Sequence, residues 1–323
     1  MLYPLLFEPI YKEMVWGGSR LNKQFNRKSP YERTGESWDI SCRPKEMGVI
    51  ENGEFSGMAF DEFISQNPIE ALGSRIYKDY EKKGFPLLVK IIDANDDLSV
   101  QVHPDDDYAL AKGFECGKNE MWYVMDAPEG QSLIIGLKEG TTAEMLRHDP
   151  MSRLNYLPVK KGDIINIPAG LVHAITNGVM VAEIQQNSDV TFRIYDYKRK
   201  GLDGRERALH LEDGAAVSDF NNLHSKKTVS LHTYTEGDVK ISPALKTPYF
   251  EVIKYEIDGR YKGRSNPEAF EIFTCTEGSC DICGFELMTS RSVFIPAGLG
   301  EYIISGKATL LKSFVPKLKG NCV

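Results

Sequence analysis

The segment from Asp97 to Pro104 carries two side chains that could bind a metal ion. Side chains alternate between the two faces of a strand, so Ser99, Gln101 and His103 share one face and the apolar residues between them share the other. A glutamine and a histidine two residues apart can ligate the same ion. The pattern equally fits a half-exposed strand whose polar face meets water, and this segment alone leaves both interpretations open.

A second polar pair stands at Lys118 and Glu120. The same alternation places both side chains on one face of a strand. A carboxylate is an ordinary zinc ligand, and a neighbouring lysine could pair with a substrate oxygen or transfer a proton. The common alternative for such a pair is a surface ion pair.

The segment Gly162–His173 is an apolar strand that runs into a Pro-x-Gly turn and then a histidine. The turn residues fix the backbone, so the histidine is delivered at a defined place. A lone histidine after an apolar strand is more often structural than a ligand. This arrangement is more specific, because it resembles the second sequence motif of the cupin family, with Pro168, Gly170, His173 and Asn177 in register.

Polar residues recur at odd positions from 183 to 193. If no bulge intervenes, Glu183, Gln185, Asp189 and Arg193 lie on one face of a strand. An arginine that faces a barrel interior needs a partner, because an unpaired buried charge is very costly. Asp189 is one possible partner, and an anionic substrate group is the other.

Two histidines, one glutamate and one glutamine therefore come from three separate strands. Zinc accepts histidine nitrogen and carboxylate oxygen, and a catalytic zinc site keeps a position open for water or substrate. The neutral amide of Gln101 is the unusual member of this set. It would leave more positive charge on the ion than a second carboxylate would, and so strengthen the ion as an electrophile.

The elements that must position these residues are mostly short strands. Strand-like runs separated by Gly, Pro, Asn and Asp predict a mainly β protein of the sandwich or barrel type. The expected strands are Leu87–Asp93, Leu98–Val102, Met121–Met125, Leu133–Leu137, Asp163–Ile167, Val179–Gln185, Thr191–Tyr195, Phe250–Ile257, Phe270–Cys275, Ser292–Ile295 and Ala308–Phe314. The expected helices are fewer, namely Asp61–Tyr80 interrupted at Pro68, Thr141–His148 with Thr142 as N-cap, and Glu206–Phe220.

One internal similarity indicates that a β unit is used twice. The sequence Ile167–Leu171 recurs as Ile295–Leu299, and each copy ends a strand-like run. The second copy has Glu301 where the first has His173, so we expect it to be structural. A boundary in the polar stretch Asn221–Asp238 then predicts a metal-binding catalytic domain with helical segments over residues 1–230 and a cupin-like domain without metal ligands over residues 236–323.

Composition limits the classes of protein that are possible. The 323 residues carry a net charge of −7, which argues against a general nucleic-acid binder, because phosphate backbones require a basic face. No run reaches the ~18 apolar residues of a membrane span, and the first ten residues lack the basic region of a signal peptide. Six cysteines are too few for a disulfide scaffold, and Cys280 and Cys283 lack the fourth ligand of a second zinc site. We therefore expect a cytoplasmic protein with reduced thiols.

Taken together in order, these motifs resemble the type I mannose-6-phosphate isomerases, specifically the short bacterial form. The resemblance runs from Leu5 to about Pro316. The matching segments are Trp16–Gly18, Gly35–Trp38, Pro86–Lys90, Leu98–Pro104, Lys118–Glu120, Pro168–His173 and Asn187–Asp189 with Arg193.

The resemblance implies a pair of cupin-like jelly-roll β-barrels with a few helices and an enzyme with one Zn²⁺ per chain. The reaction would interconvert mannose 6-phosphate and fructose 6-phosphate through a cis-enediol. The implied zinc ligands are Gln101, His103, Glu120 and His173, and the implied catalytic arginine is Arg193. Lys118 and Asp189 match positions for acid–base or orienting work, Ser99 and Lys90 match the phosphate region, and Trp16 and Glu36 match the pocket wall.

The sequence leaves the proton-transferring base open among Lys118, Asp189 and a zinc-bound water. The partner is a small sugar phosphate, with no nucleic acid or membrane, and nothing in the chain requires an oligomer. A non-enzymatic sugar-phosphate-binding or regulatory cupin and a cupin isomerase for another sugar phosphate are the alternatives. An iron dioxygenase on the same scaffold is disfavoured, because its usual His-x-His pair is Gln-x-His here.

Overall fold

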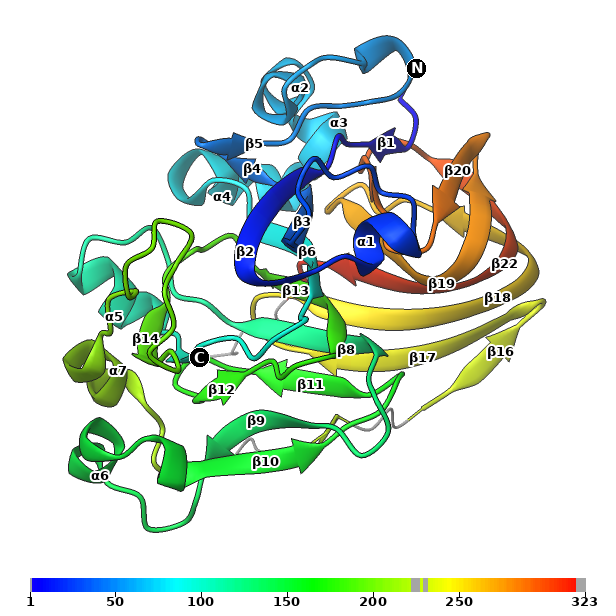
Figure 1. Cartoon of the computed structure of the whole chain (residues 1–323). Coiled ribbons are helices and arrows are strands. Elements are labelled where there is room, and N and C mark those ends of the chain that lie inside the picture. Colours follow the sequence, from blue (N-terminus) through cyan, green and yellow to red (C-terminus); the bar gives the residue numbers. More distant parts are fainter. Residues whose placement is uncertain (1, 222–226, 229–231, 318–323) are drawn as a thin grey trace. The chain divides into compact units, whose positions relative to one another are not determined.

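The computed structural model describes residues 2–221, 227–228 and 232–317, and strands dominate this part of the chain (Figure 1). The strands are β1 (Leu5–Leu6), β2 (Ile10–Gly18), β3 (Thr34–Ile40), β4 (Cys42–Arg43), β5 (Glu46–Met47), β6 (Leu87–Asp93), β7 (Val100–Val102), β8 (Glu120–Asp126), β9 (Ser132–Leu137), β10 (Leu154–Pro158), β11 (Ile164–Ile167), β12 (His173–Ala174), β13 (Met180–Gln186), β14 (Phe192–Tyr195), β15 (Lys227–Thr228), β16 (Tyr234–Glu236), β17 (Val239–Lys246), β18 (Glu251–Arg264), β19 (Glu271–Ile282), β20 (Phe285–Met288), β21 (Ser292–Ile295) and β22 (Glu301–Phe314). The prediction of a mainly β fold is confirmed, and the sheets are open rather than closed into barrels.

Helices are few and short, as expected from the sequence. They are α1 (Arg20–Lys23), α2 (Phe60–Gln66), α3 (Pro68–Leu72), α4 (Ser74–Lys83), α5 (Asp106–Ala111), α6 (Ala143–His148) and α7 (Leu211–Val217), with 3₁₀ turns at Gly53–Phe55 and Met151–Arg153. Among the described residues, no helix has the length and apolar character needed to cross a membrane.

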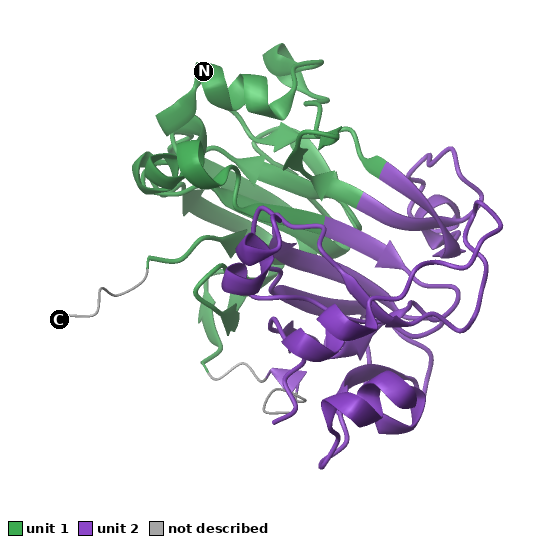
Figure 2. Cartoon of the chain, turned by 90° about the vertical axis from the view of Figure 1, so that its left-hand side faces the viewer, with its two compact units in different colours: residues 1–10, 38–89, 229–323 green, residues 11–37, 90–228 purple. Residues whose placement is uncertain are grey.

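The chain divides into two compact units, drawn in green and purple in Figure 2. Unit 1 contains residues 1–10, 38–89 and 229–323, and unit 2 contains residues 11–37 and 90–228. This division differs from the contiguous domains 1–230 and 236–323 that the sequence predicts. The physical reason is strand pairing between distant segments, because Leu5 in β1 pairs with Phe294 in β21. The predicted boundary stretch Asn221–Asp238 lies partly outside the described residues.

Unit 1 is organised around one antiparallel sheet. Its strand order is β1-β21-β19-β22-β18-β17-β16, with β20 paired to β19. Its main apolar core includes Ile241, Phe273, Ile304 and Leu310. Phenylalanines from residues 38–89 complete the unit, because Phe60 packs edge-on against Phe294 at a centroid distance of 5.1 Å and Phe85 stacks on Phe270 at 4.9 Å.

Two sheets with a core between them make up most of unit 2, and strands β3 and β6 of the larger sheet each include three residues assigned to unit 1. One has the order β15-β11-β8-β13-β6-β3-β2 and the other has the order β10-β9-β12-β7-β14. Trp122 of the first sheet and Ile135 of the second share this core. A separate core on the far face of the smaller sheet joins Val100 and Val102 to Leu146 of α6. The polar face of β7, with Gln101, therefore points into the interior between the two sheets.

Local sequence signals account for most element boundaries. The β6 and β21 strands match the predicted runs, whereas β7 begins two residues late and β18, β19 and β22 are longer than expected. The predicted helix over residues 61–80 is three helices, broken before Pro68 and again at Gly73, whose φ of +89° favours glycine. Thr142 caps α6 by accepting a hydrogen bond from the Met145 amide, as predicted. The predicted helix Glu206–Phe220 is shorter in the structure, where only α7 (Leu211–Val217) is helical.

The repeated sequence closes a turn with the same hydrogen bond in both units, although Gly170 has a φ of +86° and the equivalent Gly298 has no positive φ. The Leu171 amide donates to the Pro168 carbonyl at 3.1 Å, and the Leu299 amide donates to the Pro296 carbonyl at 3.1 Å. The first copy leads into His173, which is fully buried. The second leads into Glu301, which is exposed and pairs with Lys262 at 2.9 Å. The two copies thus share a hydrogen-bonded turn, but they differ in the conformation of its glycine and in the chemistry of the residue that follows.

Candidate metal centre and adjoining cavity

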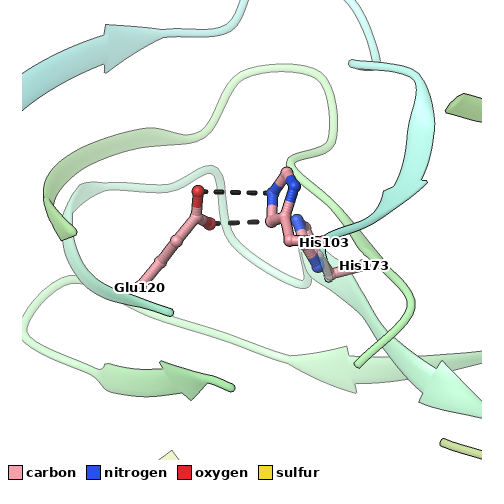
Figure 3. A group of neighbouring side chains, drawn as sticks. All are labelled: His103, Glu120 and His173. Atoms are coloured by element: carbon pink, nitrogen blue, oxygen red, sulfur yellow. Dashed lines mark ion pairs between the residues drawn. The ribbon is translucent and has the colours of Figure 1, made fainter. Parts of the chain in front are cut away.

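Two buried histidines are held by backbone carbonyls and face the same space (Figure 3). His103 follows β7 directly, and its Nδ1 lies 2.9 Å from the Val190 carbonyl oxygen. His173 begins β12, and its Nδ1 lies 2.8 Å from the Leu171 carbonyl oxygen. Each contact fixes the ring and leaves Nε2 available. This is the usual outer contact of a histidine that ligates a metal.

Glu120, at the start of β8, brings a carboxylate to these two nitrogens. Its Oε1 lies 3.3 Å from Nε2 of His103, and its Oε2 lies 3.8 Å from Nε2 of His173. The ligand atoms of the three residues all lie within 4.8 Å of one another. The Lys118 Nζ lies 2.7 Å from Glu120 Oε1, which confirms that the two side chains share a face.

Burial and charge set the protonation states of this group. Burial, together with the Lys118 ammonium, lowers the pKa of His103 to about 3, and burial also lowers the pKa of His173. Burial alone would raise the pKa of Glu120, but Lys118 and the imidazoles hold that pKa well below its usual range. Near neutral pH the set is therefore two neutral imidazoles and a carboxylate, which is the form that binds a metal ion.

The donor set and its unmet hydrogen bonds fit a divalent metal ion. Both Glu120 oxygens are fully buried and neither accepts a hydrogen bond within the described residues, although Oε1 has the ion pair with Lys118. Buried polar atoms without partners need an explanation. The Gln101 amide lies beside the group, with its nitrogen 3.4 Å from Nε2 of His173. The described residues therefore offer a group of three residues, His103, Glu120 and His173, that could hold a metal ion.

The metal group adjoins a cavity of about 260 Å³ inside unit 2. Gln101 and Lys118 belong both to its wall and to the surroundings of the ligands. All the other predicted non-ligand residues also line it, namely Trp16, Glu36, Lys90, Ser99, Asp189 and Arg193. The structure thus brings together in one place all the site residues that the sequence singled out.

Lys90 is enclosed by carboxylates on the wall of this cavity. It is 3% exposed, and its Nζ lies 3.3 Å from Glu36 and 3.7 Å from Glu183. Burial lowers its pKa, but these carboxylates outweigh the burial and raise the pKa above its ordinary value. Lys90 is therefore a permanent cation that is already matched by negative charge.

Two further charged residues, Glu183 and Arg207, line the cavity and were not predicted as site residues. Glu183 accepts a hydrogen bond from the Trp122 indole at 2.7 Å. Burial, with the charge of Glu120, raises the pKa of Glu183 to about 7. Because Glu183 belongs to the polar run at odd positions from 183 to 193, the sequence pattern could have identified it as a site residue. Arg207 lies in the irregular segment before α7, where periodicity carries no information.

The predicted common face for Glu183, Gln185, Asp189 and Arg193 is only partly correct. The chain leaves one sheet after β13 and joins the other at β14, so no single strand covers this run. Gln185 is fully buried, donates to the carbonyls of Gln186 and Ser188, and does not line the cavity. The other three side chains reach the cavity wall from both sheets and from the connection between them.

Asn119 links the strand that carries Glu120 to the turn that delivers His173. Its Nδ2 donates to Gln186 Oε1 at 2.7 Å, and its Oδ1 accepts from the Ala169 amide at 3.0 Å. We expect the Asn119→Ala variant to bind a divalent metal ion about 10- to 100-fold more weakly, as found when outer contacts of metal ligands are removed. Competition with a chromogenic chelator measures this affinity.

The matched control is Asn22→Ala. Asn22 also makes two hydrogen bonds, to Ser29, but it is not part of the ligand group or the cavity wall. The affinity for the metal ion should be unchanged in this variant. Equal metal affinities in the two variants would show that Asn119 does not position the candidate ligands.

Comparison with known proteins places these residues in a family context. Residues 5–132 match the family model for the catalytic domain of type I phosphomannose isomerases. The chain is 39% identical to the mannose-6-phosphate isomerase of Streptococcus mutans over 267 residues, covering 81% of each chain. It is 34% identical to mannose-6-phosphate isomerase ManA of Bacillus subtilis over 319 residues, covering 96% of this chain and 98% of the relative.

A solved structure shows the same similarity in three dimensions. The mannose 6-phosphate isomerase structure from Bacillus subtilis superimposes with a TM-score of 0.87 at 31% identity, covering 97% of this chain and 99% of that chain. The similarity therefore extends over nearly all of both units.

Proposed function

Because the chain belongs to the type I mannose-6-phosphate isomerase family, we propose that it interconverts mannose 6-phosphate and fructose 6-phosphate. The observation that carries this proposal is the buried His103–Glu120–His173 group beside a cavity that Lys118 and Arg193 also line. A small sugar phosphate is the proposed partner. None of the described cysteines forms a disulfide, which supports a reducing compartment such as the cytoplasm.

We propose zinc as the metal, one ion per chain. His103, Glu120, His173 and the amide oxygen of Gln101 would hold it, since zinc takes nitrogen and carboxylate ligands and a catalytic site keeps a position open. When bound, zinc supplies a Lewis acid that polarises the oxygens at C1 and C2 of the sugar. The neutral imidazoles and the charged carboxylate described above are the protonation states that this role requires.

The proposed reaction moves a proton from C2 of the aldose to C1 through a cis-enediol. A base must take this proton and return it to the neighbouring carbon. Lys118 is held by Glu120, and Lys90 is held by Glu36 and Glu183. Glu183, with its pKa raised to about 7 by burial, is the cavity group best matched to proton transfer near neutral pH. We therefore favour Glu183 as the base and retain Asp189 and Lys118 as orienting groups.

Arg193 is proposed to stabilise the negative charge that develops on the substrate. It lies on β14 directly opposite Gln101 of β7. Its Nε is buried and has no hydrogen-bond partner within the described residues, and no ion pair with Asp189 is formed there. Of the two partners that the sequence left open, an anionic substrate group is thus the one favoured. A fixed donor aimed at developing charge needs no reorganisation during the reaction.

The proposal is tested by turnover before and after removal of the metal. The purified protein is assayed for conversion of mannose 6-phosphate to fructose 6-phosphate, then treated with a chelator, and then given back zinc. We expect activity to disappear with the metal and to return with zinc, because zinc would supply the Lewis acid that the proposed reaction requires.

The alternatives predict different results from the same samples. A regulatory or binding cupin would hold zinc and the sugar phosphate without turnover. An isomerase for another sugar phosphate would convert a different aldose phosphate faster than mannose 6-phosphate. Activity that survives complete loss of metal would exclude the proposed role of the ligand group.

A further inference from the structure

The wall of the cavity is divided by charge. Lys90 lies between Glu36 and Glu183, at 3.3 and 3.7 Å, and all three side chains line the cavity. A phosphate placed on Lys90 would therefore lie against two carboxylates. Like charges in a poorly solvated site repel strongly. This part of the wall is a poor place for a dianion, although Lys90 matches the phosphate region in sequence.

Another part of the cavity wall carries the two arginines Arg193 and Arg207. Both guanidinium groups line the cavity. Arg193 donates from Nη1 to the Ala208 carbonyl at 3.0 Å, which directs it toward the segment that carries Arg207. Burial lowers the pKa of Arg193, and the positive charge of Arg207 lowers it further. Two cations that disfavour each other would both be stabilised by an anion bound between them.

Arg207 is held in a fixed orientation by Asp196. Its Nε and Nη2 bond to the two carboxylate oxygens, with an Nε distance of 2.6 Å. Asp196 is 4% exposed and also binds Arg199, whose Nη2 lies 2.8 Å away. Arg199 also pairs with Asp96 at 3.6 Å, so Asp96 and Asp196 together match Arg199 and Arg207, and Arg193 adds a further positive charge. The Asp196 contacts use only Nε and Nη2 of Arg207, and Nη1 has no contact with Asp196.

We propose that Arg207, together with Arg193, binds the phosphate group of the substrate, and that Lys90 instead orders Glu36 and Glu183. This inference rests on the proposed function, because it assigns a part of the same cavity. Arginine suits the task, since its planar fork matches phosphate oxygens in pairs and its charge is permanent. Arg207 would then select phosphorylated over unphosphorylated sugars.

The test compares Arg207→Gln with a matched control, Arg199→Gln. Both arginines bind Asp196, but only Arg207 lines the cavity. For Arg207→Gln we expect KM for mannose 6-phosphate and the inhibition constant of inorganic phosphate to rise about 10- to 100-fold, as a lost charged hydrogen bond predicts. The value of kcat should change less than about threefold. For Arg199→Gln both constants should stay within about twofold.

Two further variants make the outcome decisive. Arg207→Lys keeps the charge and loses the paired contact, so its KM should fall between those of Arg207→Gln and the parent protein. The Arg207→Lys variant also tests the proposal if the Arg207→Gln protein does not fold. Lys90→Met should reduce kcat and leave inhibition by inorganic phosphate unchanged. If Lys90→Met weakens phosphate inhibition and neither Arg207 variant does, the proposal is wrong.

Failure of this inference can be separated from failure of the proposed function. Calorimetric titration of the zinc-loaded protein with inorganic phosphate needs no turnover. If the protein proves inactive on mannose 6-phosphate, binding that depends on Arg207 and not on Arg199 would still support the phosphate site. Binding that is the same in all variants would overturn it even in a fully active enzyme.

Discussion

Replacing Glu120 by glutamine is expected to release the metal and to reduce turnover of mannose 6-phosphate by about 10³-fold or more. The change keeps the shape of the side chain and removes the only carboxylate of the ligand group. In the parent protein the Lys118 ammonium lies 2.7 Å from Glu120 Oε1. The variant would leave this ammonium beside the imidazoles without a negative partner. Loss of several kcal/mol of metal-derived stabilisation of the transition state corresponds to a factor of this size.

Metal content by atomic emission and turnover by a coupled assay are measured on the same samples. The matched control is Glu301→Gln, which makes the same chemical change after the equivalent turn of unit 1, where the glutamate is exposed. That variant should keep its zinc and its activity. An active Glu120→Gln protein that retains stoichiometric zinc would remove Glu120 from the ligand set.

Replacing Glu183 by glutamine is expected to reduce kcat by about 10²- to 10⁴-fold while zinc content stays unchanged. The carboxyl group is buried, and burial raises its pKa to about 7. Only the deprotonated form can accept a proton from carbon, so kcat/KM of the parent protein should rise with pH through the pKa of this group. Glutamine cannot titrate, so the residual activity of the variant should lack that dependence.

Glu271→Gln is a closely matched control for this change. Glu271 is also buried, accepts a hydrogen bond from the Tyr302 hydroxyl at 2.9 Å and pairs with Lys312 at 2.6 Å. It lies in unit 1 and is not part of the cavity wall. A comparable loss of kcat in both variants would point to stability rather than proton transfer. A larger loss in Asp189→Asn than in Glu183→Gln would make Asp189 the base.

The ligand group was predictable because its residues lie at ends of short strands with clear local signals. The alternation around Gln101 and His103, and the turn before His173, fix side-chain directions within a few residues. Glu183 was harder to assign, since its role depends on burial and on the approach of Lys90 and Trp122 from other strands. Arg207 could not be found, because nothing in an irregular loop indicates which cavity it reaches.

The predicted domains differ from the observed units for a related reason. Local patterns locate four of the strands of residues 236–317, but they miss β17 and β20 and shorten β18, β19 and β22. They also do not reveal the partners of residues 1–10 and 38–89. Those partners are set by pairing such as Leu6 with Val293 and by ring packing such as Phe60 with Phe294. Contacts between residues so far apart in the chain leave no periodic trace in the sequence.

The discontinuous composition of unit 1 has a consequence during synthesis on the ribosome. Residues 38–89 emerge long before residues 229–317. Phe60 and Phe85 therefore cannot pack against Phe294 and Phe270 until those two residues have been synthesised. Unit 2 has all its segments once residue 228 has emerged. The unit with the metal ligands can therefore be completed while unit 1 is still a nascent, exposed chain, and that interval is when such chains depend most on chaperones.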